Sequence, residues 1–142
     1  MIRYAIESDL EFLKKYEHGI CEAELRNSIR ARRILVLFHK DSFIGWLRFN
    51  LFWDNTPFMN MLYLLEEYRG RGYGTHLVRY WETEMIKKNY KTVLTSTLSN
   101  EQAQFFYRKN GYVDCGSLLL PDEPLEILFM KNLGFTQIPS LP

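Results

Sequence analysis

Two runs of strand-like pattern lie in the first half of the chain, at residues 34–38 and 43–52. The polar segment 40–42 between them suits a hairpin turn. Because successive side chains of a strand point to opposite faces, the second run has two distinct faces. We expect the odd-numbered face to be the core face; it carries Phe43, Gly45, Leu47, Phe49 and Leu51.

Helical patterns flank these runs. A short strand is predicted at residues 2–5, and Ser8 is placed to cap a helix that ends at Tyr16, with Glu11 completing a capping box. A second helix is expected at residues 21–31. Turn-forming residues and Pro57 make residues 53–57 a loop, and a buried strand is predicted at residues 59–65.

The second half continues with alternating helices and strands. Between residues 72 and 89 the apolar positions fall on one helical stripe, opposite Glu82 and Lys88. A strand follows at residues 92–96, and Asn100 is expected to cap a helix whose inner face carries Tyr107. An antiparallel pair is predicted at residues 112–120 and 125–130.

These elements predict an α/β (α+β) fold, with a mixed, mostly antiparallel central sheet of six to seven strands and about four helices. The length of 142 residues suits one domain. We expect that domain to span residues 1–133, followed by a C-terminal tail at residues 134–142.

Composition narrows the possible functions. With 18 Lys+Arg against 17 Asp+Glu, the chain lacks the positive field of a nucleic-acid-binding protein. It has no apolar run long enough to span a membrane and no signal peptide, so a cytoplasmic protein is expected. Cys21 and Cys115 show no metal or redox spacing and are predicted to be reduced packing residues. No metal site is expected.

A glycine-rich segment carries the chemistry. The predicted strand at residues 59–65 leads into Arg69-Gly70-Arg71-Gly72-Tyr73-Gly74-Thr75, which opens directly into a helix. Glycines allow close backbone approach, and free N–H groups at a helix start attract negative charge, so a phosphate or pyrophosphate is the natural ligand. The spacing fits neither the Walker A motif nor the dinucleotide-binding motif.

This segment resembles the Arg/Gln-x-x-Gly-x-Gly/Ala loop of the GNAT superfamily of N-acetyltransferases. Residues 100–112, Asn-Glu-Gln-Ala-Gln-Phe-Phe-Tyr-Arg-Lys-Asn-Gly-Tyr, resemble the second signature of that superfamily, Asn-x-x-Ala-x-x-Phe-Tyr-x-Lys-x-Gly-Phe/Tyr. The resemblance implies a GNAT-like fold whose fourth and fifth strands diverge, here around Leu64 and Leu65. It also implies acetyl-CoA as the co-substrate.

The resemblance further assigns roles to single residues. The backbone of Leu64 and Leu65 would bond the pantetheine arm, and the amides of Arg69, Gly70, Arg71, Gly72, Tyr73, Gly74 and Thr75 would hold the pyrophosphate. Asn100 would contact the pantetheine side, and the Tyr107 hydroxyl would assist the departing thiolate. An acceptor amine would attack the thioester directly, with a fourth-strand N–H polarising the carbonyl and no covalent enzyme intermediate.

Other assignments stay open at this stage. No carboxylate stands where some family members carry a general base, and the candidates are Asp54, Glu66, Glu24 and His18. Core packing is expected for the aromatic set Trp46, Phe52, Trp53 and Phe58, of which one or two could wall the acceptor pocket. The aromatic loop favours a small-molecule amine over a protein lysine or N-terminus. A homodimer is possible, and the alternative function is a non-catalytic acyl-CoA-binding sensor or interaction module.

Overall fold

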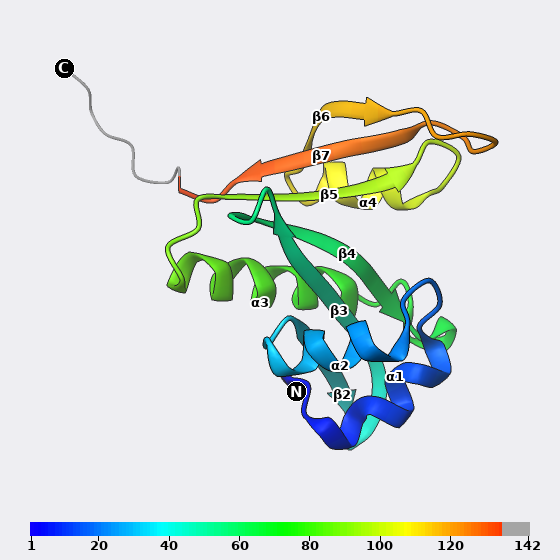
Figure 1. Ribbon diagram of the computed structural model, residues 1–142, viewed down its shortest axis with the longest axis vertical. Helices are drawn as coiled ribbons and strands as arrows, with labels where there is room; N and C mark the ends of the chain where they lie inside the picture. Colours follow the sequence, from blue (N-terminus) through cyan, green and yellow to red (C-terminus); the bar gives the residue numbers. More distant parts are fainter. Residues whose placement is uncertain (135–142) are drawn as a thin grey trace. The chain divides into compact units, whose positions relative to one another are not determined.

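The computed structural model describes residues 1–134, in which seven strands form one mixed sheet in the order β1-β2-β3-β4-β5-β7-β6 (Figure 1). The strands are β1 (Ile2–Tyr4), β2 (Ile34–His39), β3 (Ser42–Phe52), β4 (Thr56–Leu64), β5 (Thr92–Leu98), β6 (Val113–Leu118) and β7 (Glu126–Asn132). The helices are α1 (Leu10–Tyr16), α2 (Glu22–Arg30), α3 (Tyr73–Lys87) and α4 (Ala103–Lys109), with short 3-10 helices η1 (Glu7–Asp9) and η2 (Glu66–Tyr68).

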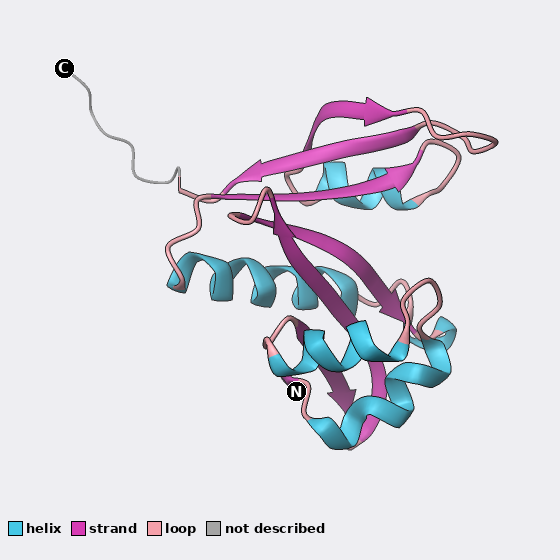
Figure 2. Cartoon of the chain, in the orientation of Figure 1, coloured by secondary structure: helices cyan, strands magenta, loops and turns pink. Residues whose placement is uncertain are grey.

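Most strand neighbours are antiparallel, and β4 and β5 are parallel. The predicted fold class is therefore confirmed. Figure 2 colours the helices and the strands of this fold. The chain forms two compact units: residues 1–50 and 61–80 make the first, and residues 51–60 with 81–134 make the described part of the second. The predicted tail falls almost wholly on residues 135–142, which lie outside the described residues.

In the first unit, the predicted hairpin is present. Lys40 and Asp41 both have positive φ, 50° and 67°, which is the conformation of a tight turn between right-twisted antiparallel strands. The turn sets the register in which Val36 lies opposite Trp46 and Leu35 opposite Leu47. Strand β1 then pairs with β2 on its other side.

The odd face of β3 is buried as predicted, with Leu47 and Phe49 in the core, but the even face is buried as well. Ile44 and Trp46, on the even face, are both fully buried, as is Leu47 on the odd face. Trp46 belongs to a core cluster with Leu13 of α1 and Leu25 and Ile29 of α2. The two helices thus cover the even face, so both faces of the middle of β3 are dry.

A buried carboxylate accompanies this packing. The Trp46 indole Nε1 donates a hydrogen bond to Glu17 Oε2 at 2.8 Å, and Arg48 Nε donates to the same oxygen at 2.9 Å. Glu17 follows directly after α1, and its side chain is 1% exposed. Because burying a polar indole or a charge without a partner is costly, these contacts allow Trp46 and Glu17 to lie inside.

The predicted Ser8 cap is wrong. Ser8 lies within η1, and α1 begins at Leu10. Asp9 instead accepts the Ile6 N–H at 2.7 Å and an Arg3 guanidinium contact at 2.7 Å. Burial acts to raise the pKa of Asp9, but the hydrogen bonds from Arg3 and Ile6 outweigh it and hold that pKa below its usual range.

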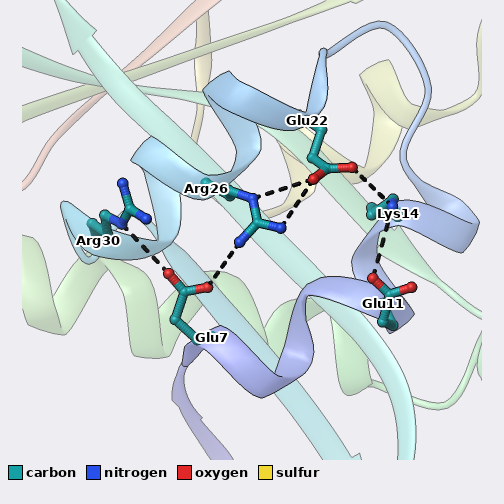
Figure 3. Close-up of polar contacts among 6 residues, drawn as sticks. All are labelled: Glu7, Glu11, Lys14, Glu22, Arg26 and Arg30. Atoms are coloured by element: carbon teal, nitrogen blue, oxygen red, sulfur yellow. Dashed lines mark hydrogen bonds and ion pairs between the residues drawn. The ribbon is translucent and has the colours of Figure 1, made fainter.

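Exposed ion pairs join η1, α1 and α2 (Figure 3). Glu22 pairs with Lys14 of α1 at 2.8 Å and with Arg26 at 3.0 Å, and Glu7 of η1 pairs with Arg26 and Arg30, both at 3.4 Å. Exposed pairs add little to stability one by one. These connect three consecutive elements on one surface, which helps to fix how the two helices cross.

In the second unit, β7 lies between β5 and β6, and α4 lies against β5 (Figure 1). The antiparallel pair predicted near the C-terminus is confirmed as β6 and β7. The parallel pairing of β4 with β5 joins Phe58 to Leu94 and Met59 to Thr95. The divergence of β4 and β5 expected further along stays a prediction.

Three further residue predictions are wrong. Pro57 is a buried residue of β4 and not part of the preceding loop. Glu82, predicted on the polar face of α3, is only 7% exposed. Cys21 and Cys115 are both exposed free cysteines and so are not packing residues.

Candidate functional site

The predicted site residues, cofactor-binding and catalytic, fall into two groups, one in each unit. Residues 64–75 belong to the first unit, and Asn100 and Tyr107 belong to the second. In the first group, β4 ends at Leu64, η2 follows, and α3 starts at Tyr73. The predicted succession of strand, glycine loop and helix is therefore present in one continuous segment.

Two glycines shape this loop. Gly70 has φ +74° and Gly72 has φ +90°, a left-handed backbone that a residue with a side chain adopts only with strain. A Cβ placed at either residue would meet no atom within 4 Å. The glycines are therefore required by the backbone, and the space beside them is open to a ligand.

The start of α3 adds donors to this space. The first helical hydrogen bond runs from the His76 N–H to the Gly72 carbonyl at 3.0 Å. The N–H groups that come before it, on Tyr73, Gly74 and Thr75, have no acceptor within the helix because of helical geometry. With the positive end of the helix dipole, they form a site suited to a phosphate group.

Three side chains of the loop region make contacts with neighbouring residues. Arg69 Nε donates to the Leu64 carbonyl at 2.9 Å, and its guanidinium lies 5.3 Å from the Tyr63 ring centre. Arg71 lies 5.8 Å from the Tyr68 ring, and the Tyr73 hydroxyl contacts His39 Nδ1 at 3.2 Å. The Arg69 side chain therefore bonds the end of β4, and the donors described for the anion site are backbone groups.

The end of β4 is held equally firmly. The Leu65 N–H donates to the Ile44 carbonyl at 2.8 Å, and the Leu65 carbonyl accepts from Tyr68 at 2.9 Å. Gly45 lies so close to this strand that a Cβ there would be 2.5 Å from the Tyr63 carbonyl oxygen. The Leu65 N–H is thus already in use, and the predicted pantetheine contacts of Leu64 and Leu65 stay a prediction.

In the second unit, Asn100 does not cap α4, which corrects the prediction. Asn100 is an exposed turn residue after β5, and the N-cap of α4 is Gln102. The turn is held by Glu101, whose Oε1 accepts the Leu98 N–H at 3.1 Å and the Thr97 hydroxyl at 3.2 Å. Glu101 thus ties the turn back to the end of β5, and no side chain caps the start of α4.

Tyr107 is placed on the inner face of α4, as predicted. It is 6% exposed and is surrounded by the rings of Phe106, Tyr112 and Phe129, with centres 5.4–5.9 Å away. Its hydroxyl is hydrogen-bonded to Thr95. Thr95 Oγ1 donates its single proton to the Met59 carbonyl at 3.0 Å, so Tyr107 is the donor in the contact between the two hydroxyls.

This environment keeps Tyr107 neutral. Burial raises the pKa of Tyr107 to about 12, and the Glu101 charge adds to the increase. The phenol is therefore protonated throughout the physiological range and acts as a hydrogen-bond donor. Thr95 was not among the predicted site residues, and its only signal in the sequence is its alternation with Val93 along the strand.

None of the four candidate general bases is buried. Asp54, Glu66, Glu24 and His18 are all exposed to solvent. Trp53, considered as a pocket wall, is 77% exposed, and Trp46 is core. Within residues 1–134 no group of three acidic, histidine or cysteine side chains could hold a metal, and no described helix is long and apolar enough to cross a membrane.

Comparisons with known proteins agree with this geometry. Ribosomal-protein-alanine N-acetyltransferase from Brucella melitensis has 17% identity, a TM-score of 0.78, and coverage of 93% of this chain and 99% of the other. Arabidopsis thaliana Naa50, solved with the bisubstrate analogue CoA-Ac-MVNAL, has 16% identity, a TM-score of 0.77, and coverage of 93% and 97%. No curated protein matches the chain.

A third structure, a putative streptothricin acetyltransferase from Bacillus anthracis bound to acetyl coenzyme A, has 20% identity, a TM-score of 0.66, and coverage of 70% of this chain and 61% of the other. At these identities the structures show a shared fold. The family model described as the acetyltransferase (GNAT) family matches residues 3–112, a span that includes the glycine loop and the Tyr107 motif. The chain therefore belongs to the GNAT family of acetyltransferases.

Proposed function

We propose that this protein is an N-acetyltransferase that moves acetyl from acetyl-CoA to a primary amine without a covalent enzyme intermediate. The observation that carries the proposal is the loop at Gly70 and Gly72. Its left-handed glycines leave open space beside the N–H groups at the start of α3. Membership of an acetyltransferase family makes acetyl-CoA the donor for such a phosphate site.

Each group of residues has a distinct task in this proposal. The backbone of residues 69–75 holds the pyrophosphate, with Leu64, Leu65 and Asn100 on the pantetheine side. Acetyl-CoA supplies an activated thioester, whose carbonyl carbon the amine attacks while the C–S bond breaks and the electron pair leaves on sulfur. A backbone N–H of β4 polarises the carbonyl oxygen.

Tyr107 serves the leaving sulfur. A thiol has a pKa of about 8.5, so complete proton transfer from a phenol of pKa about 12 to a thiolate is unfavourable in free energy. The Tyr107 hydroxyl therefore stabilises the departing thiolate by donating a hydrogen bond, for which it turns away from Thr95. The amine loses its proton to water or to an exposed carboxylate, because no buried base is assigned.

The acceptor is proposed to be a small-molecule amine, on the strength of the aromatic loop between β3 and β4. There the Phe52 and Trp53 rings lie tilted to each other with centres 4.6 Å apart, and Trp53 is largely exposed. A peptide N-terminus is the second candidate. It is favoured because the Brucella structure is named for a ribosomal-protein alanine and Naa50 was solved with a peptide-CoA conjugate.

The first test is a thermal-shift titration with acetyl-CoA, CoA, ATP and NAD in parallel. A ligand at about 100 times its Kd adds about 2.7 kcal/mol of stability. Stabilisation by the two CoA species alone supports the donor assignment, and stabilisation by none of the four contradicts it. Equal stabilisation by ATP would show a general phosphate site instead of a CoA site.

The second test offers polyamines, amino acids, aminoglycosides and short peptides with free N-termini, and measures the release of CoA thiol. Turnover with a small amine but not with peptides supports the first acceptor class, and the reverse result supports the second. Firm CoA binding without turnover on any amine would favour the alternative, a non-catalytic acyl-CoA-binding module.

A further inference from the structure

A partly buried ion pair lies close to Tyr107 but belongs to no task described so far. Glu82 of α3 is 7% exposed, and its Oε1 accepts a hydrogen bond from Lys131 Nζ of β7 at 2.9 Å. The Tyr112 hydroxyl donates to the second carboxylate oxygen, Oε2, at 2.8 Å. Tyr112 is 1% exposed, so the phenol and the carboxylate lie inside the second unit, whereas the Lys131 side chain is 25% exposed.

The cluster ties together the turn that follows α4. Lys131 Nζ also donates to the carbonyl of Asn110, the C-cap residue of α4, at 3.0 Å. Gly111 has φ +93°, and a Cβ there would lie 3.2 Å from Lys131 Cε. One ammonium therefore bonds an oxygen from α3 and an oxygen from the end of α4, and the glycine lets the chain turn tightly beside it.

Tyr112 connects this cluster to Tyr107. Its backbone N–H donates to the Tyr107 carbonyl at 3.0 Å, and its ring lies edge-on to the Tyr107 ring with centres 5.8 Å apart. A displacement of Tyr112 would therefore disturb Tyr107 through both the backbone and the ring. The Glu82 carboxylate, held in turn by Lys131, bonds the Tyr112 hydroxyl and opposes that displacement.

We propose that Glu82 and Lys131 are positioning residues for Tyr107 and act through Tyr112. This inference rests on the proposed role of the Tyr107 hydroxyl. Packing alone does not need such a pair, because a buried ion pair is often no more stabilising than apolar side chains of similar size. A fixed geometry for a hydrogen bond to a departing thiolate does need a rigid support, since small displacements of catalytic groups cost large factors in rate.

The test is a double-mutant cycle between Lys131→Met and Tyr107→Phe, with kcat and the Kd of CoA measured for each variant. We expect Lys131→Met to lower kcat about tenfold with the Kd of CoA within about twofold, because the support acts on the rate and not on binding. In the Tyr107→Phe background, Lys131→Met should lower kcat by less than about twofold, since the hydroxyl that it positions is absent.

Tyr112→Phe is the milder variant if Lys131→Met fails to fold, because it removes one hydroxyl and keeps the ring. The same non-additivity with Tyr107→Phe is expected. Lys87→Met is the matched control: Lys87 of α3 pairs with Glu84 at 3.1 Å but its side chain is 68% exposed. It should leave kcat and the Kd of CoA unchanged.

Three results would overturn the proposal. An unchanged kcat in both Lys131→Met and Tyr112→Phe would exclude a positioning role. Rate losses that multiply with that of Tyr107→Phe would show that the cluster acts only on overall structure. An unchanged kcat in Tyr107→Phe alone would instead remove the proposed role of Tyr107 itself, so the two failures are distinguishable.

Discussion

Gly70 and Gly72 lie in a solvent-exposed loop, whereas Tyr107 is 6% exposed and enclosed by aromatic rings. The loop offers backbone N–H groups, and the residues that create it are consecutive in sequence. Tyr107 offers one hydroxyl, whose partner Thr95 and ring neighbour Phe129 are distant in sequence. The anion site can therefore be recognised from a short motif, and the state of Tyr107 depends on the packing of the whole second unit.

The largest effect should come from placing a negative charge in the loop. Gly72→Asp adds both left-handed strain and repulsion toward phosphate, and we expect the Kd of CoA to rise about a hundredfold or more. Isothermal titration with CoA measures it. Gly19→Asp is the matched control, because Gly19 also has φ +87° and open space, but lies between α1 and α2. Unchanged affinity in Gly72→Asp would exclude the loop assignment.

The next effect concerns the support of the loop. Gly45→Ala would place a Cβ 2.5 Å from the Tyr63 carbonyl oxygen and 2.6 Å from Leu64 Cδ2, so it should destabilise the fold by about 1–3 kcal/mol. Urea unfolding gives this value. Gly116→Ala in β6, where a Cβ would meet Leu128 Cδ1 at 3.7 Å, should cost far less. Equal costs would show that β4 does not confine Gly45.

For the buried region, Tyr107→Phe should lower kcat about tenfold and leave the Kd of CoA near the wild-type value. Because the pKa of Tyr107 is raised to about 12, its protonated form persists through pH 10, and its own titration should cause no fall in kcat between pH 8 and 10. Tyr90→Phe, between α3 and β5, is the control. A rate limb near pH 9 that disappears in Tyr107→Phe would contradict the assigned neutral donor.

The same raised pKa has a consequence for stability. The folded-state pKa of Tyr107 lies above the unfolded value of about 10. The contribution of its protonated form to the free energy of unfolding is therefore fully present below pH 10 and is lost as the pH rises from about 10 toward 12. The free energy of unfolding of the wild type should therefore fall in this range, and Tyr107→Phe should fall less steeply. The same fall in the free energy of unfolding with pH in the wild type and in Tyr107→Phe would contradict this prediction.

The smallest effects should come from deleting one hydroxyl in each region. Thr95→Val removes a buried donor to the Met59 carbonyl and should cost about 1 kcal/mol of stability. Tyr73→Phe removes the contact with His39, which is only partly buried, and should change the Kd of CoA by less than about threefold. If Tyr73→Phe raised the Kd of CoA by much more than threefold, the loop would depend on its tertiary contact with His39 as Tyr107 depends on its packing.

Much of the fold was predictable from the sequence. Residues 34–38 and 43–52, with the turn between them, matched β2 and β3, and the stripe on α3 gave Leu77, Val78, Trp81 and Met85 as buried. Local caps were predicted less well. Asp9 and not Ser8 accepts a backbone N–H before α1, and no side chain caps α4, because several acceptors near a helix start compete and only their geometry decides.

The sequence by itself determined the elements, the glycine loop and the resemblance to an acetyltransferase family, because these depend on neighbours within a few residues. Only the tertiary structure decided which polar side chains are buried. Glu82 and Lys131 are 49 positions apart, and Glu17 and Trp46 are 29 apart. A periodic pattern shows which residues share a face of an element. It does not show what covers that face, or which distant group offsets the free-energy cost of burying a charge.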